Sequence, residues 1–519
     1  MRMTASEFVS YRRPTRCDLR VFLRHQQEPE AEPGPYEVVL RRLGLRHERT
    51  HLATLGTFAD MTAASIDEHV GKTADAIERK VPVLYQPAFL ARERIGGTDV
   101  EIVGVPDYLI LDGDNYLIRD SKMALRIDEE NHPEILLQVQ LYGWLYVRSC
   151  GAAPKGLQVH AGTDEIVTVP YDGGTTALRE LERLLTIKQL SIEPYEPVGW
   201  TKCLGCGYAD RCWAQAEKNG DVALVYGVDQ SLARTLYGQG VRSRRDLLAT
   251  FDVASLSEVK RPYGNREQRV GKTAERILRF ADAVEKNQEI LLAAPPIPPS
   301  RNYVMFDLEG MPPHLDEIDK IYLWGAQVFG ENPSEFKVAL SGFGANGDKD
   351  GWIGFLDNAK QIFETYGDIP WVHWAPYEQT YLRRYVERFG DPEGVAARVV
   401  ANLLDLLTVT RQSVVLPLPS LSLKVVEDYV GFERKEAEFG GAWAMATFIE
   451  ATESSDEGKR RELMDKIVAY NREDLEATWA VFQWLKCKVS SSREPKSSVS
   501  IAQLSHQLAA IAAQSPKMV

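Results

Sequence analysis

The stretch from 104 to 122 constrains the fold most, because it specifies a β-hairpin. Strand-forming runs at 108–111 and 116–118 flank an Asp-Gly-Asp-Asn turn at 112–115. An Asp-Gly turn between apolar β-formers is a strong hairpin signal. Strand alternation then places Asp120 and Lys122 on one face, and chain reversal brings Asp107 toward them.

This hairpin admits two interpretations. Two carboxylates and an ammonium at the end of a sheet can hold a divalent metal and orient a water for phosphodiester attack. The alternative is a surface hairpin with a solvated Asp–Lys pair. Other motifs in the sequence are needed to choose between these two interpretations.

Composition predicts a multidomain globular protein. The chain has 519 residues, 44% hydrophobic and 26% charged, enough for two to four domains with their own cores. There is no apolar run of 18 residues and no apolar signal core at the N-terminus, so we expect no membrane partner and a cytoplasmic location. The net charge of −13 argues against nucleic-acid binding through bulk charge but leaves a nuclease possible, because metal-binding carboxylates count as negative.

Cysteine spacing predicts a metal site. Cys203, Cys206 and Cys212 lie within ten residues and begin with a CxxC pair. In a reducing compartment such clustering indicates metal more than disulfide. A tetrahedral or cubane site needs a fourth thiolate, for which Cys17 is the best candidate, and the sequence does not separate zinc from iron–sulfur.

A helical segment at 135–147 carries Gln138 and Tyr142 on one face, since they are four residues apart. Gln138 could equally be a partly buried amide bonded to backbone. An earlier helical pattern contains His47 followed by Glu48, a pair that by itself is typical of a solvated helix face.

Taken together, the first 215 or so residues resemble RecB-family nucleases of the PD-(D/E)XK superfamily, in the iron–sulfur branch that includes the AddB nuclease and CRISPR-associated relatives. The resemblance is carried by motifs in family order: Cys17, Gly-x-x-His47-Glu48, Gly-x-x-Asp107, Asp120-Ser-Lys122, Gln138-x-x-x-Tyr142 and the Cys203, Cys206, Cys212 run.

The resemblance implies a role for each of these residues. His47, Asp107 and Asp120 would hold Mg²⁺ or Mn²⁺, and Lys122 would polarise the water or the scissile phosphate. Gln138 and Tyr142 would line the site. The four cysteines, Cys17, Cys203, Cys206 and Cys212, would hold a [4Fe–4S] cluster that pins the first segment to the last, with Zn²⁺ as the alternative.

Residues 221–292 are predicted to form a small all-α connector. Arg269-Val-Gly271-Lys272 opens a helix and resembles helix-hairpin-helix modules, which present backbone amides to a phosphate. From 242 to 279 there are ten Lys or Arg and five Asp or Glu, a local charge of +5. The alternative is a linker bundle with a solvated basic face.

A Pro-rich linker at 293–300 predicts a domain boundary before the last domain, 301–488. An apolar strand there ends in Asp307 and Glu309, which face the same side and are costly to bury without a cation. Glu378 follows a strand-to-helix junction. Tyr470 and Asp474 are one turn apart on a long helix.

This region resembles DEDD exonucleases of the ribonuclease H-like superfamily, in a RecB-associated branch. The resemblance implies that Asp307, Glu309, Glu378 and Asp474 bind two metals and that Tyr470 orients the attacking water. Family members usually have aspartate at the position of Glu378, and the extra methylene is expected to weaken the second metal.

The sequence therefore predicts an α/β multidomain nuclease with domains at 1–220, 221–292 and 301–488 and a tail at 489–519. The expected activity is metal-dependent exonucleolysis of DNA with single-stranded character. A helicase partner is possible, because the chain has no Walker-type phosphate loop. The rival readings are a nucleic-acid-binding scaffold with an inactive nuclease fold, and an RNA-processing exonuclease.

Overall fold

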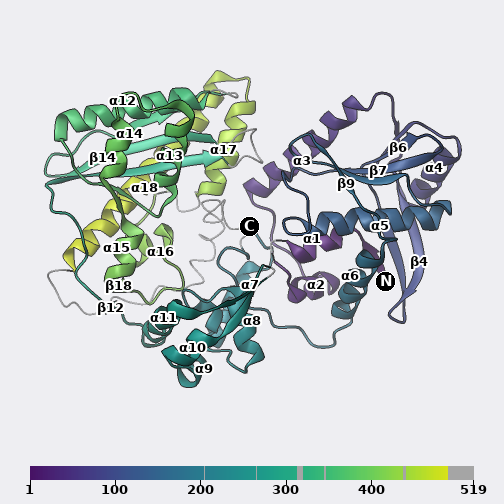
Figure 1. The fold of residues 1–519 in the computed structure, drawn as a ribbon, viewed down its shortest axis with the longest axis horizontal. Coiled ribbons are helices and arrows are strands. Elements are labelled where there is room, and N and C mark those ends of the chain that lie inside the picture. The colour runs from purple at the N-terminus through teal and green to yellow at the C-terminus, as the bar shows by residue number, and fades with distance from the viewer. Residues whose placement is uncertain are drawn as a thin grey trace. The chain divides into compact units, whose positions relative to one another are not determined.

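The computed structural model describes residues 1–13, 15–203, 205–264, 266–311, 320–343, 347–435 and 440–488. The chain divides into two compact units (Figure 1). Of the described residues, the first unit contains those of 1–31 and 38–196, and the second contains those of 32–37 and 197–488. The predicted tail, 489–519, lies outside the described residues.

The first unit contains two sheets. The larger has six strands in the order β2 (Ala59–Asp60), β3 (Val83–Tyr85), β6 (Tyr108–Asp112), β7 (Asn115–Ser121), β8 (Gly156–His160) and β9 (Ile166–Val169). The smaller has the order β1 (Arg2–Thr4), β5 (Thr98–Gly104), β4 (Phe89–Ile95). The predicted hairpin is present as β6 and β7, and Gly113 takes the left-handed conformation in its turn, with φ of 68°.

Six helices accompany these sheets: α1 (Ser6–Arg12), α2 (Asp18–His25), α3 (Pro35–Thr54), α4 (Ile66–Glu78), α5 (Pro133–Cys150) and α6 (Thr175–Lys188). Helix α5 is buried along most of its length, as its apolar sequence predicts. It begins with Pro at its first position and ends at Gly151, which has a φ of 72°.

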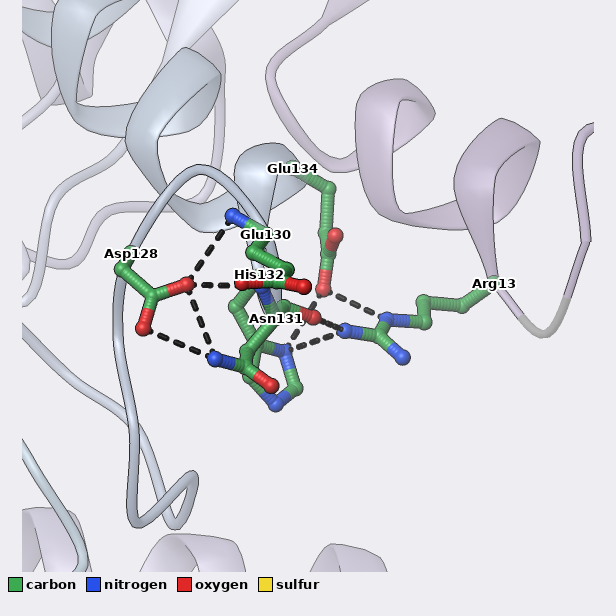
Figure 2. A network of polar contacts seen from close by, with 6 residues as sticks. All are labelled: Arg13, Asp128, Glu130, Asn131, His132 and Glu134. Carbon is green, nitrogen blue, oxygen red and sulfur yellow. Dashed lines mark hydrogen bonds and ion pairs between the residues drawn. The ribbon is translucent and has the colours of Figure 1, made fainter. Parts of the chain in front are cut away.

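A polar network fixes the start of α5 (Figure 2). The Arg13 guanidinium, at the end of α1, donates to Glu134 Oε1 at 2.7 Å and approaches His132 Nδ1 at 2.7 Å. The carboxylate of Asp128 accepts the backbone N–H of Asn131 at 2.7 Å and so shapes the preceding loop. The network thereby anchors the helix that carries Gln138 and Tyr142.

The second unit begins with the connector, which is not all-α as predicted. Helix α7 (Ala209–Asn219) precedes the predicted range 221–292. Within that range the elements are η1 (Val222–Leu224), α8 (Gln230–Gly238), α9 (Arg244–Thr250), α10 (Val253–Glu258), β10 (Lys260–Tyr263), β11 (Arg266–Arg269), η2 (Gly271–Thr273), α11 (Ala274–Lys286) and β12 (Ile290–Leu291). Strands β10 and β11 form an antiparallel hairpin beside Gly264, whose φ is 56°. Such a left-handed residue suits a turn and breaks a continuous helix.

The last region is built on a five-stranded sheet in the order β15 (Lys337–Leu340), β14 (Lys320–Gly330), β13 (Asn302–Met311), β16 (Trp371–His373), β17 (Leu403–Asp405). Strands β14 and β15 are antiparallel to their neighbours, whereas β13, β16 and β17 are parallel. The remaining elements are α12 (Asp348–Tyr366), α13 (Tyr377–Phe389), α14 (Val395–Ala401), α15 (Leu406–Ser413), β18 (Val414–Val415), α16 (Leu423–Tyr429), α17 (Gly441–Glu453) and α18 (Glu457–Cys487).

Alternation along β13 decides where its acids lie. Val304, Phe306 and Leu308 belong to one core with residues of α12, α13 and α14, whereas Tyr303 and Met305 belong to another with residues of α18. Successive side chains of a strand point to opposite faces. The acids that follow Met305 at every second position therefore face α18, which is visible behind the sheet in Figure 1.

The connector and the last region share one core. Buried side chains from α8, α11, β18 and α18 pack in a single cluster, and β12 pairs with β18. The predicted boundary at 293–300 is thus not a division between the compact units. Within the described ranges, no helix combines the length and the apolar character needed to cross a membrane.

Candidate functional site

The first acid cluster lies where β5 leads into the β6–β7 hairpin. The backbone N–H of Asp107 donates to Asp120 Oδ1 at 3.3 Å, and the N–H of Ser121 donates to Asp107 Oδ2 at 2.7 Å. Lys122 Nζ forms an ion pair with Asp120 Oδ2 at 2.5 Å. The structure therefore brings the three predicted residues together.

The charges of this cluster perturb one another. Burial and the charge of Asp120 raise the pKa of Asp107 well above its usual value. Burial lowers the pKa of Lys122, but the charges of Asp120 and Asp107 outweigh that effect, so the pKa is raised. Lys122 thus stays an ammonium, which compensates one carboxylate.

His47, expected among these acids, lies in a different group. Its ring stacks on His160 with centroids 4.3 Å apart, and its Nε2 is buried and finds no hydrogen-bond partner among the described residues. Its nearest ligand group consists of His160 and Asp164, with ligand atoms within 4.8 Å of one another.

Glu48, the next residue along α3, shares a hydrogen-bond donor with Asp107. The amide Nε2 of Gln86 donates to Glu48 Oε1 at 2.8 Å and to Asp107 Oδ1 at 3.1 Å. Adjacent residues on a helix point in different directions, which is why the His-Glu motif alone did not decide which side chain faces the acids.

Gln138 and Tyr142 lie as their spacing predicts. Gln138 Nε2 donates to the Tyr142 hydroxyl at 2.7 Å. Burial and the charges of Asp120 and Asp107 raise the pKa of Tyr142 well above its usual value. Close approach of Tyr142 requires glycine at Gly104, where a Cβ atom would come within 2.8 Å of the ring.

The predicted cysteine ligands are distributed over both units. Cys17, in the first unit, caps α2 by accepting the N–H of Arg20 at 3.4 Å. Cys203, in the second unit, accepts the N–H of Gly199 at 3.3 Å. Cys206 and Cys212 follow in the turn and first residues of α7, so that the three-cysteine run lies in one short loop and helix. The [4Fe–4S] or Zn²⁺ assignment stays a prediction.

The second acid cluster joins β13 to α18. Carboxylate oxygens of Asp307, Glu309 and Asp474 all lie within 4.8 Å of one another. Burial, followed by the charges of Asp474 and Glu309, raises the pKa of Asp307 well above its usual value. Burial and Asp474 do the same to the pKa of Glu309. Like charges held this close in a buried place require protons or a cation.

Asn471, which the sequence did not single out, fixes Asp307. Its Nδ2 donates to Asp307 Oδ2 at 2.7 Å. The side chain lies against Gly325, the residue opposite Asp307 on β14, so tightly that a Cβ atom at Gly325 would overlap its Oδ1. The signal in the sequence that could have indicated Asn471 was its position between Tyr470 and Asp474, in the same helical turn.

Glu378 is buried next to a histidine. Its Oε2 lies 3.0 Å from His373 Nδ1, and both side chains are 3% exposed. Burial raises the pKa of Glu378, although His373 opposes this. Conversely, burial lowers the pKa of His373, but Glu378 outweighs it and the pKa is raised. The side chain of Glu378, whose extra methylene was expected to weaken a metal site, is thus held in place by His373 at the end of β16.

A buried arginine, absent from the predicted site, compensates part of the second cluster. The Arg434 guanidinium forms an ion pair with Asp474 and bonds to Glu427 Oε2 at 2.9 Å. Lys424 Nζ lies 5.3 Å from the ring centroid of Tyr470, and the Arg434 guanidinium lies 5.7 Å from it. Burial and Arg434 lower the pKa of Lys424 to about 8. Burial and Asp474 raise the pKa of Tyr470, which keeps its hydroxyl protonated.

The four predicted acids of this region, Asp307, Glu309, Glu378 and Asp474, line one cavity of about 270 Å³. Tyr470 is not among its described lining residues. Asp474 Oδ2 is buried and has no hydrogen-bond partner in the described chain. This surplus of acceptor oxygens fits a hard divalent cation such as Mg²⁺ or Mn²⁺, which prefers oxygen ligands.

The predicted phosphate-binding residues of the connector lie on its surface. Arg269 ends strand β11 and pairs with Glu258 at 2.7 Å. Gly271 begins η2 with a φ of 56°, and Lys272 is exposed. Strand β11 and the short η2 turn lead directly into α11, so a helix does open after these residues, and the helix-hairpin-helix assignment stays a prediction.

Comparisons with known proteins bear on the last region. Residues 304–486 match the family model of the RNase_H superfamily. The solved structure titled "Crystal structure of SSO0001" is 18% identical, covers 41% of this chain and 86% of its own, and gives a TM-score of 0.21. The comparison with curated proteins gave no match.

The matched region contains β13 from Val304 onward, the whole of α13, and α18 except for its last residue. These elements carry the acids of the second cluster. Residues 304–486 thus form a ribonuclease H-like nuclease domain, of a superfamily that uses divalent metals.

Proposed function

We propose that this chain is a metal-dependent exonuclease that releases nucleotides from DNA ends of single-stranded character. The convergence of Asp307, Glu309 and Asp474 within 4.8 Å carries this proposal. These carboxylates would hold Mg²⁺ or Mn²⁺, and a bound ion supplies Lewis acidity and a water of lowered pKa.

The remaining residues of the site position these groups. Asn471 orients Asp307, and Arg434 orients Asp474 through its ion pair. Glu378 and His373 share a hydrogen bond at the cavity wall and can hold a proton there. Tyr470 keeps its hydroxyl proton and is proposed to orient water once substrate is bound.

The test is cleavage of end-labelled oligonucleotides by the full chain with Mg²⁺, Mn²⁺ or chelator. Single-stranded DNA, duplex DNA and RNA of one sequence are compared, and products are separated by length. We expect metal-dependent release of mononucleotides that Asp307→Asn abolishes. Binding of the strand without metal-dependent release would instead establish the scaffold reading, and faster release from RNA would establish an RNA-processing enzyme.

A second proposal concerns the first unit, as a PD-(D/E)XK site of the RecB type. It is supported by the contact of Asp107 with Asp120 and by the Asp120–Lys122 ion pair at 2.5 Å. Asp107 and Asp120 would hold the metal, with Glu48 beside them, and Lys122 would contact the water or the phosphate. Residual cleavage by the Asp474→Asn chain should disappear when Asp120→Asn is added; cleavage that persists in the double variant contradicts this assignment.

We also propose that Cys17, Cys203, Cys206 and Cys212 bind one [4Fe–4S] cluster, with Zn²⁺ as the rival. The chain purified without oxygen is expected to be brown and to contain four iron atoms per cluster. Colourless protein with one zinc per chain would establish the zinc site. Cys206→Ala should lower both the bound metal and the melting temperature.

A further inference from the structure

One wall of the acidic cavity is not acidic, and one of its residues lies outside the matched range 304–486. It includes Tyr226, which follows η1 of the connector, together with Trp374 and Arg411. The connector thereby supplies a side chain to the cavity that holds Asp307 and Asp474. No predicted site residue accounts for this contribution.

Two arginines surround Tyr226. Arg411 donates from its Nε at 3.0 Å and from a terminal nitrogen at 2.7 Å to the Tyr226 hydroxyl. The guanidinium carbons of Arg276 and Arg411 lie 5.8 and 5.9 Å from the centre of its ring. Arg276 comes from α11 and Arg411 from α15, and both are exposed.

These two arginines differ from their neighbours in having no carboxylate partner. In the part of the chain that the structure describes, neither Arg276 nor Arg411 forms an ion pair. On the same helix α11, Arg279 pairs with Glu275 at 2.5 Å and Lys286 pairs with Asp282 at 2.8 Å. Uncompensated guanidinium groups beside an acidic cavity are suited to an anion that must approach the acids.

The cavity also offers polar atoms that lack partners. Trp374 Nε1 and Ser422 Oγ both belong to its lining residues, and both are buried without a hydrogen-bond partner in the described chain. The volume of about 270 Å³ lies near the lower end of small-ligand pockets. It suits one monomer of a polymer and not a stretch of double helix.

We propose that Arg276 and Arg411, arranged around Tyr226, bind a backbone phosphate of a single-stranded nucleic acid whose terminal nucleotide lies in the acidic cavity. The inference rests on the proposed nuclease function. Guanidinium groups bind phosphate oxygens in pairs of hydrogen bonds, and the Tyr226 hydroxyl holds Arg411 in place for that contact. The connector then contributes side chains that help the last region to bind its substrate.

The experiment measures binding in a chain that does not cleave. Fluorescein-labelled oligo-dT and oligo-U are titrated in Mg²⁺ with the full-length protein that carries both Asp120→Asn and Asp307→Asn, so that both proposed sites are inactive, and anisotropy gives Kd at several salt concentrations. Adding Arg411→Ala or Arg276→Ala should weaken binding of the single strand about tenfold each, as loss of one charge-assisted contact predicts. The slope of log K against log salt should fall by about 0.7 per lost phosphate contact.

Matched controls remove the same charge from α11. Arg279→Ala and Lys286→Ala lose cations that are paired with carboxylates, so Kd should stay close to that of the parent. Tyr226→Phe keeps the ring and removes the hydroxyl, and should weaken binding less than Arg411→Ala. Equal melting temperatures for all variants establish that folding is intact.

Each result decides the proposal. The two oligonucleotides distinguish a DNA strand from an RNA strand as the bound polymer. Arg411→Ala and Arg276→Ala proteins that bind like the Lys286→Ala control would overturn the phosphate site, as would equal binding of a blunt duplex. If wild-type protein fails to cleave yet shows arginine-dependent binding, the nuclease proposal fails and the phosphate site stands.

Discussion

The two acid clusters differ in how much of the chain is needed to build them. Asp107 and Asp120 are joined through a single hairpin, and the contact from Asp107 to Asp120 spans 13 positions. Asn471 reaches Asp307 across 164 positions. Turn chemistry builds the first cluster locally, whereas the second exists only when α18 packs on β13.

The clusters also differ in how their charge is compensated. In the first, Lys122 pairs with Asp120 and its side chain is 27% exposed. In the second, the Arg434 side chain is 5% exposed and is shared between Asp474 and Glu427, while two clustered acids, Asp307 and Glu309, keep raised pKa values, against Asp107 alone in the first. The second cluster therefore needs an added cation more than the first does.

The largest expected effect comes from removing one acid from each cluster. Asp474→Asn should reduce metal-dependent mononucleotide release by about a hundred- to a thousandfold, because charge stabilisation at the reacting phosphate is lost. Asp120→Asn should leave that release in place and remove only cleavage by the first unit. Asp465→Asn on α18 and Asp114→Asn in the hairpin turn, both exposed, serve as matched controls. Equal loss of release in Asp120→Asn would mean that the clusters act as one site.

The internal cations should differ in their contribution to stability. Arg434→Met removes the guanidinium that pairs with buried Asp474 and Glu427 and, among the described residues, leaves only the charge of Lys424 near them, so it should lower the free energy of unfolding by about 3–5 kcal/mol. Lys122→Met should cost less, because the Lys122 side chain is 27% exposed and solvent can replace part of its interaction with buried Asp120. Urea titration of the metal-free chain measures both. A larger cost at Lys122 would reverse the comparison.

A smaller effect is expected from disturbing Asn471 without touching an acid. Gly325→Ala places a Cβ atom on the Asn471 side chain, so Asp307 should lose its hydrogen bond. Loss of a partner of this kind reduces metal affinity about 10–100-fold. Calorimetric titration with Mn²⁺ measures the change. Gly238→Ala in α8, where a Cβ atom meets nothing within 4 Å, is the control and should bind Mn²⁺ like wild type.

The mildest effect concerns pH and the metal-free protein. Asp307 and Glu309 have raised pKa values, so the folded state holds protons that the unfolded chain releases above about pH 4. The free energy of unfolding of the metal-free chain should therefore fall as pH rises from about 4 through the raised pKa values. Each kcal/mol lost should lower Tm by about 2–4 °C. Asp307→Asn should flatten this decline, and Mg²⁺ should raise Tm most at the higher pH. A metal-free Tm that rises over this range would contradict the assignment.

Local patterns predicted the parts of both clusters that local geometry controls. The hairpin with Asp107 and Asp120 follows from its turn, and the pairing of Gln138 with Tyr142 follows from helix spacing. Alternation along β13 gave the shared face of Asp307 and Glu309. The RNase H-like domain was expected from the resemblance carried by these acids and the later motifs, and the family match at 304–486 bears it out.

Contacts between distant segments could not be predicted in this way. Arg434 carries no local signal because its partners, Glu427 and Asp474, come together only through packing of α16 against α18. Tyr226 reaches the cavity from the connector by the same kind of packing. The β10–β11 hairpin was missed because its strands are short, highly charged and mostly exposed, so no alternation marked them.

The pairing of β12 with β18 has a practical consequence for dividing the chain. A fragment that starts at the Pro-rich segment would lose β12 and α11 and would leave apolar side chains of β18 and α18 facing water. Exposed apolar surface of this kind drives aggregation. An autonomous fragment with the ribonuclease H-like domain should therefore start near residue 197, where the second compact unit begins.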